Sequence, residues 1–178
     1  MTNQDDTKRN TPGLMKVFVY GTLKRGMWNH ERFCAGALSI EEAVVRGRLY
    51  EMDCGLPVLQ VPEADILAHG TADPCADVAA QACFDAEMAQ HPDPRAKGRT
   101  RRGWGLVRGE LMTFDDPEER LPSLDRLEGF RPDGPSLYDR VLVPVLLCEA
   151  RLTAWAYVSS AESWGLRPVK SGCWKLKA

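Results

Sequence analysis

Six short apolar runs constrain the fold of this chain more than any other feature of its sequence. Each has the length and the β-branched or aromatic content of a strand, and most alternate in part between apolar and polar residues. They cover residues 15–20, 44–52, 57–61, 107–114, 138–147 and 151–159. In the fifth run, Val141, Val143, Val145 and Leu147 fall on one period-two face and should point the same way. The connection to the sixth run, residues 149–151, fits a short hairpin.

Helical segments are fewer and do not alternate regularly with these strands. Residues 28–34 can form about two turns, and residues 76–90 are rich in Ala with apolar residues at helical spacing. The acidic segment 115–119 precedes another helix, which Pro122 is expected to restart and Gly129 to end. This pattern predicts a single α+β domain and not a doubly wound sheet.

Length and charge exclude several classes of protein. A chain of 178 residues is long enough for one domain that buries roughly 70% of its unfolded surface. Its net charge of −2 gives no attraction to nucleic acid or anionic membrane, and no apolar run approaches the ~20 residues that span a bilayer. Residues 1–13 are polar and predict a disordered N-terminal tail, not a signal peptide, so that the domain covers residues 14–178. A cytoplasmic protein is expected, by default a monomer, without nucleic-acid or membrane partners.

The cysteines and histidines indicate neither disulfides nor a metal. Six cysteines lie far apart without a C-x-x-C pair or a visible export signal, which favours reduced thiols. Cys54 and Cys148 are interpreted as small core residues. Four residues with suitable ligand atoms have spacings that match no compact zinc motif, so no metal is predicted: His69, Cys75, Cys83 and His91.

The stretch from residue 69 to residue 103 is predicted to be a surface insertion. It contains the Ala-rich helix, then a Pro-rich turn and a basic run over residues 95–102. Long connections are tolerated on a protein surface. In a chain of net negative charge the basic run is best interpreted as a solvated loop.

Two motifs stand out for chemistry. The first apolar run ends in Tyr20, Gly21, Thr22 and Leu23, and a strand that stops at Gly-Thr exposes backbone N–H groups that can hold a carboxylate or an oxyanion. The second motif, over residues 124–129, reads Leu-Asp-Arg-Leu-Glu-Gly.

Together these motifs resemble those of the γ-glutamylcyclotransferase-like family, which includes γ-glutamylamine cyclotransferases and plant avirulence-induced proteins. Further similar segments, at residues 47–50, 109–111, 137–140 and 154–158, occur in the family's order. The resemblance implies a small mixed β-barrel flanked by short helices. It also implies an intramolecular cyclotransferase that releases 5-oxoproline and a free amine from a small γ-glutamyl conjugate.

Such a reaction makes modest demands on the protein. The substrate's own α-amine attacks its γ-carbonyl, so a site that holds the folded conformer gains several kcal/mol from proximity. No protein nucleophile, metal or organic cofactor is required, only one general base. The sequence contains no G-x-S-x-G, H-E-x-x-H, P-loop or G-x-G-x-x-G motif, in keeping with that requirement.

The resemblance assigns the site residues. Glu128 matches the family's catalytic Glu, and apolar neighbours should raise its pKa, although the residues alone favour a surface Glu at a helix end. The segment 20–23 is carried over as the substrate-binding loop, whose N–H groups would hold either the oxyanion or the α-carboxylate. Tyr138 aligns with a family Tyr near the pocket. The Tyr20 side chain could line the pocket or belong to the core.

Two nearby residues are expected to act structurally. His30 is expected to fix the loop through hydrogen bonds and not to serve as a second base. Arg140 could pair with Asp125 or with a substrate carboxylate, and the ion pair is favoured.

Two alternatives remain open. One is acyl transfer or hydrolysis on another γ-glutamyl-like ligand, including one bound to a carrier protein. The other is a non-catalytic ligand-binding module of the same fold. The enzyme hypothesis requires Glu128 to face a cavity shared with the amides of residues 21–23.

Overall fold

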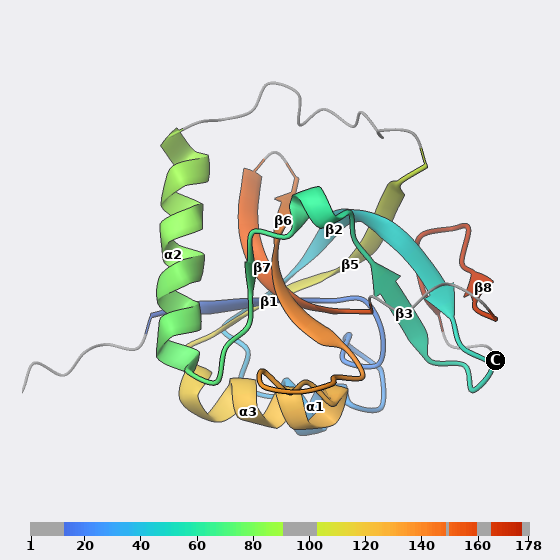
Figure 1. The fold of residues 1–178 in the computed structure, drawn as a ribbon, viewed down its shortest axis with the longest axis horizontal. Helices are drawn as coiled ribbons and strands as arrows, with labels where there is room; N and C mark the ends of the chain where they lie inside the picture. Colours follow the sequence, from blue (N-terminus) through green and yellow to red (C-terminus); the bar gives the residue numbers. More distant parts are fainter. Residues whose placement is uncertain (1–12, 91–102, 149, 160–164, 176–178) are drawn as a thin grey trace, which may run out of the picture.

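Five strands close into a small barrel in the computed structural model, which describes residues 13–90, 103–148, 150–159 and 165–175 (Figure 1). Around the barrel the order is β2 (Ser39–Glu51), β5 (Gly105–Phe114), β1 (Met15–Val19), β7 (Ala150–Val158) and β6 (Asp139–Leu147). β6 returns to β2 at Leu146 and Val44, which closes the ring. β1 and β7 are parallel, whereas the other neighbours are antiparallel, so the barrel is mixed. The predicted α+β fold with a small mixed barrel is therefore confirmed.

The long strand β2 belongs to two pairings. Its first part runs antiparallel to β5, and its last residues pair with β3 (Pro57–Gln60) and β8 (Arg167–Pro168). Gly47 lies where β2 passes from one to the other, and a Cβ there would come within 2.7 Å of the Gln60 carbonyl oxygen. Only glycine allows the two backbones to approach this closely. A two-residue strand, β4 (Ala68–His69), extends the sheet beside β6.

Alternation along the strands divides the core into two layers. One cluster takes residues from all five barrel strands and fills the barrel interior; it includes Val141, Val143 and Val145 of β6, with Leu147 packed at its margin. This confirms the predicted common face. The opposite faces of β1 and β7 pack outward against the helices, with Trp155 fully buried between them.

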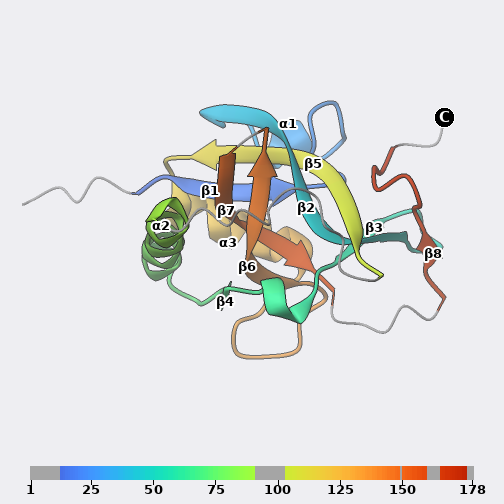
Figure 2. The ribbon, with the colours of Figure 1, turned by 90° about the horizontal axis from the view of Figure 1, so that it is seen from above.

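Three α-helices lie outside the barrel in the part of the chain that the structure describes: α1 (His30–Phe33), α2 (Pro74–Gln90) and α3 (Pro117–Glu128). A short 3-10 helix, η1, covers Glu63–Asp65. α2 packs along β7 and against α3, while α1 touches α3 at the end of the barrel (Figures 1 and 2). The predicted insertion thus includes a helix that covers the barrel; whether it is an insertion relative to the family stays a prediction.

α3 is one continuous helix, so the predicted restart at Pro122 is wrong. Pro122 removes one backbone hydrogen bond, but it lies on the exposed side, and Leu121 and Leu124 on either side of it are fully buried. Their burial holds the helix across the proline. The predicted end is confirmed: Gly129 adopts φ 67°, and its N–H donates to the Asp125 carbonyl oxygen.

Other differences concern connections. Cys54 and Cys148 are exposed, not core residues as predicted, because both lie in turns between strands. Cys148, which follows β6, has a φ of 47°. Residue 149, residues 1–12 of the predicted tail and the predicted basic loop (residues 95–102) lie outside the described residues. Within the described ranges, no helix is both long and apolar enough to span a bilayer.

Candidate active site

The segment 20–23 forms a tight turn directly after β1. The N–H of Lys24 donates to the Gly21 carbonyl oxygen at 3.2 Å, and the N–H of Asn29 donates to that of Thr22 at 3.2 Å. The Asn29 side-chain amide also donates to Thr22 Oγ1 at 3.0 Å, and His30 Nδ1 lies 2.9 Å from the Leu23 carbonyl oxygen. His30 therefore fixes the loop by a hydrogen bond, as predicted.

Gly21 has no room for a side chain. A Cβ at this position would lie 2.4 Å from Cγ of Pro57, the first residue of β3. The ring of Pro57 therefore sits directly on the loop backbone, and the β2–β3 connection forms one wall beside it. Glycine is required here for close packing, not for an unusual φ.

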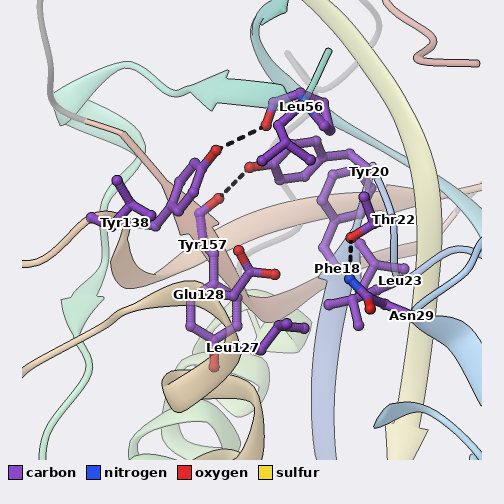
Figure 3. A pocket seen from close by; sticks show the side chains of 14 residues that line it. Phe18, Tyr20, Thr22, Leu23, Asn29, Leu56, Leu127, Glu128, Tyr138 and Tyr157 are labelled. Atoms are coloured by element: carbon purple, nitrogen blue, oxygen red, sulfur yellow. Dashed lines mark hydrogen bonds between the residues drawn. The ribbon is translucent and has the colours of Figure 1, made fainter. Parts of the chain in front are cut away.

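Glu128 is the last residue of α3 and faces the loop across a cavity (Figure 3). The cavity has a volume of about 130 Å³. The Glu128 carboxylate lies between Tyr138, Tyr157 and the side of the cavity formed by Thr22 and Leu23 (Figure 3). The lining residues are Phe18, Val19, Tyr20, Gly21, Thr22, Leu23, Asn29, Leu56, Pro57, Leu127, Glu128, Leu137, Tyr138 and Tyr157.

Burial raises the pKa of Glu128 from 4.5 to about 7. Among the lining residues Glu128 is the only Asp, Glu, Lys, Arg or His, so no counter-ion lies in the cavity to stabilise its charged form. The predicted effect of apolar neighbours on this carboxyl is therefore present. A carboxyl with a pKa near 7 can both take and return a proton at neutral pH.

Two tyrosines complete the wall opposite the helix. The Tyr20 hydroxyl donates to the Tyr157 carbonyl oxygen at 2.8 Å, and the Tyr138 hydroxyl donates to the Pro57 carbonyl oxygen at 3.2 Å. Burial raises the pKa of both phenols, and the negative charge of Glu128 raises them further. Both hydroxyls are thus neutral donors committed to backbone oxygens. Tyr20 is both a core residue and a pocket residue, so the two readings of its side chain hold together.

The structure brings all the predicted site residues together, namely Glu128, the segment 20–23 and Tyr138. Arg140 does not line the cavity; its Nε lies 3.0 Å from Asp125 Oδ1, the ion pair favoured from the sequence. The other lining residues were not predicted for the site; they are Phe18, Val19, Asn29, Leu56, Pro57, Leu127, Leu137 and Tyr157. The only sequence signal for Tyr157 is its place in the family-like segment 154–158.

Metal ligands do not gather elsewhere in the described ranges. There, no three His, Cys, Asp or Glu side chains lie close enough together to hold an ion. Cys75 and Cys83 are exposed on α2, and His91 lies outside the described residues.

The model of the AIG2-like gamma-glutamyl cyclotransferase family matches the chain over residues 17–86 and 76–176. The chain belongs to this family. Membership supports a cyclotransferase-type activity and agrees with the positions of the two motifs on the cavity wall. Among curated proteins, none matches the chain.

One solved structure, YkqA, supports the fold at low sequence identity. YkqA from Bacillus subtilis is 18% identical, with a TM-score of 0.52 over 90% of this chain and 39% of YkqA. The chain thus spans about two fifths of the length of that protein. An AIG2-like protein from mouse is 22% identical (TM-score 0.43, 85% of this chain and 82% of the other). The uncharacterized protein PH0828 from Pyrococcus horikoshii is 18% identical (TM-score 0.47, 90% and 89%).

Proposed function

We propose that this protein is an intramolecular cyclotransferase that converts a small γ-glutamyl conjugate into 5-oxoproline and a free amine. The observation that carries the proposal is the placement of Glu128, a carboxyl without a counter-ion, opposite the turn of residues 20–23 in one cavity. Family membership supports the same reaction class.

In the proposed reaction, Glu128 first takes a proton from the substrate's α-ammonium group. The freed amine attacks the γ-carbonyl carbon, forming the C–N bond of the lactam. In the tetrahedral intermediate the attacking nitrogen still carries two protons, and Glu128 gives its proton to the leaving nitrogen and takes one of these two. The bond to the leaving nitrogen then breaks, and the proton held by Glu128 passes to the released amine, which departs as its ammonium ion. The reaction balances without a redox partner, a metal or a protein nucleophile.

The loop provides the second element of the proposal. Backbone N–H groups at Gly21, Thr22 and Leu23 would hold either the oxyanion of the intermediate or the substrate's α-carboxylate. An oxyanion donor typically contributes about 3–4 kcal/mol to the barrier reduction. The hydrogen bonds from Asn29 and His30 fix this loop before substrate arrives, so little reorganisation is needed.

The leaving amine would lie toward the mouth of the cavity. Leu56 and Leu137 line that cavity and are 38% and 64% exposed, which places apolar surface at the solvent boundary. An amine with apolar carbon next to its nitrogen would make favourable contact there.

The test is release of 5-oxoproline, followed by mass spectrometry, from a panel of γ-glutamyl amines, amino acids and peptides. Glu128→Gln should lower kcat about 10²–10⁴-fold, the range for loss of a general base. Glu119→Gln, an exposed carboxyl on the same helix, is the matched control and should retain full activity. In the wild type, kcat/KM should fall about tenfold per pH unit below pH 7, because only ionised Glu128 can accept the proton.

Three results would contradict this proposal. Full activity in folded Glu128→Gln would exclude Glu128 as the base. Release of free glutamate in place of 5-oxoproline would indicate a hydrolase. Binding of panel members without turnover would indicate a non-catalytic ligand-binding module.

A further inference from the structure

Asp125, one turn before Glu128 on α3, lies at the centre of a polar cluster outside the cavity lining. Its Oδ1 accepts a hydrogen bond from the Tyr157 hydroxyl at 2.7 Å and lies 3.0 Å from Arg140 Nε. Its backbone carbonyl oxygen accepts the N–H groups of Gly129 and Phe130, which cap the helix. The side chain and the backbone of one residue therefore hold the last turn of α3.

Arg140 anchors this cluster to the rest of the molecule. Its side chain is only 1% exposed, its Nη1 lies 2.8 Å from Asp77 Oδ2 on α2, and its Nη2 donates to the Thr71 carbonyl oxygen at 2.8 Å. The contacts with Asp77 and Asp125 are short charge pairs that lack hydrogen-bond geometry. The guanidinium also lies over the rings of Phe130 and Trp155, at 5.0 and 5.3 Å from the ring centroids.

Tyr157 connects this cluster to the cavity. Its ring lines the cavity alongside Glu128, while its hydroxyl lies at the far end and binds Asp125 (Figure 3). At the other end of the residue, its carbonyl oxygen accepts the Tyr20 hydroxyl. Tyr157 therefore connects the segment that follows β1, through Tyr20, to the helix that carries Glu128, through Asp125.

Glu128 itself makes no ion pair or hydrogen bond with the described residues, so no direct partner orients its carboxylate. The charge of Glu128 raises the pKa of four titratable groups around it, which are Tyr20 after β1, Tyr138 before β6, Tyr157 on β7 and Cys34 after α1. All four have a raised pKa and are neutral at pH 7. On its own helix the nearest acid toward the barrel is Asp125, whose charge faces Arg140.

We propose that Asp125, Tyr157 and Arg140 are positioning residues, which hold the last turn of α3 so that the Glu128 carboxylate stays inside the cavity. The proposal rests on the proposed function for its effect on activity. Its effect on the environment of Glu128 is independent of any substrate.

Tyr157→Phe is the sharpest test because it removes one hydroxyl, keeps the ring on the cavity wall and changes no charge. The first readout is a carbon-13 NMR titration of the Glu128 carboxyl, assigned with Glu128→Gln. In the wild type we expect a pKa near 7, and in Tyr157→Phe a pKa displaced toward 4.5, since a loosened helix end lets water reach the carboxylate. Tyr50→Phe, on β2 and away from the cavity, is the matched control and should titrate like the wild type.

The second readout is kinetic. Displacement of a catalytic group by about 1 Å can reduce turnover up to 10²-fold, so Tyr157→Phe should lower kcat about 10- to 100-fold with little change in KM. Asp125→Ala should do the same. In the Asp125→Ala background, Tyr157→Phe should have little further effect, because the hydroxyl has already lost its acceptor.

An unchanged Glu128 titration in folded Tyr157→Phe would overturn the proposal, as would an unchanged kcat in a wild type that turns over substrate. If the wild type releases no 5-oxoproline, the proposed function fails, but the titration still decides whether these residues position Glu128. If Asp125→Ala does not fold, Tyr157→Phe alone decides.

Discussion

Two carboxyl groups one turn apart on α3 have opposite surroundings. Asp125 lies next to the Arg140 guanidinium and accepts a hydrogen bond from the Tyr157 hydroxyl. Glu128 faces a cavity whose described lining holds no cation. Burial raises the pKa of both. For Asp125 the charge of Arg140 and the hydrogen bond from Tyr157 oppose that rise, and for Glu128 nothing does. The difference shows how one short helix can present, on neighbouring turns, a carboxyl paired within the protein and a carboxyl that faces a cavity without a counter-ion.

The largest effect on stability should come from removing Arg140, the cation that pairs with Asp125. Arg140→Met leaves the buried Asp77 and the half-buried Asp125 without their cation, and loss of one partner of a buried ion pair typically costs about 3–5 kcal/mol in the free energy of unfolding. Urea denaturation at pH 7 would measure it. Arg167→Met, which removes a 57% exposed partner of Glu51, should cost less than about 1 kcal/mol. Equal losses in the two variants would mean that the buried cluster has no special role in stability.

Removing the charge of Glu128, which has no counter-ion, should instead increase the stability of the folded protein above pH 7. The pKa of Glu128 is about 7 in the folded protein and 4.5 when unperturbed, so the folded state holds the proton more tightly. Stability therefore decreases as the pH rises from 4.5 to 7, by about 3 kcal/mol at most. Glu128→Gln cannot ionise and should be more stable than the wild type above pH 7 but not at pH 4. Thermal unfolding of both proteins across this range checks it, and parallel pH curves would contradict it.

A smaller effect should follow from crowding the loop that Glu128 faces. In Gly21→Ala the new methyl group meets Pro57 Cγ, and overpacking of this kind typically costs about 1–3 kcal/mol. Because the loop must shift, kcat/KM for 5-oxoproline release should also fall. Expressed as a free energy, this loss should exceed the loss in the free energy of unfolding. Gly134→Ala, where a Cβ meets nothing within 4 Å, is the control. Normal kinetics in Gly21→Ala would show that the loop backbone is not held as tightly as its contact with Pro57 indicates.

Local sequence signals were sufficient for the parts of the site that depend on one segment. The strand before Gly21 and the helix end at Gly129 follow from short-range patterns, and the resemblance then supplied Glu128. Tyr157 and Pro57 were not predicted, because the parallel pairing of β1 with β7 and the β2–β3 pairing bring them to the cavity. Single-segment periodicity contains no information on such pairings. The exposed Cys148 was missed for a related reason, since its environment depends on a tight turn at φ 47°.

The two tyrosine hydrogen bonds at the cavity join residues far apart in the chain. Tyr20 and Tyr157 are separated by 137 positions, and Tyr138 and Pro57 by 81. Contacts of such long range form late in folding, because the entropy of closing long loops must be overcome first. The cavity therefore exists only once the barrel has closed. A molecule that fits it binds the closed barrel alone, and by mass action raises the free energy of unfolding by about 2.7 kcal/mol at a concentration of 100 times its Kd.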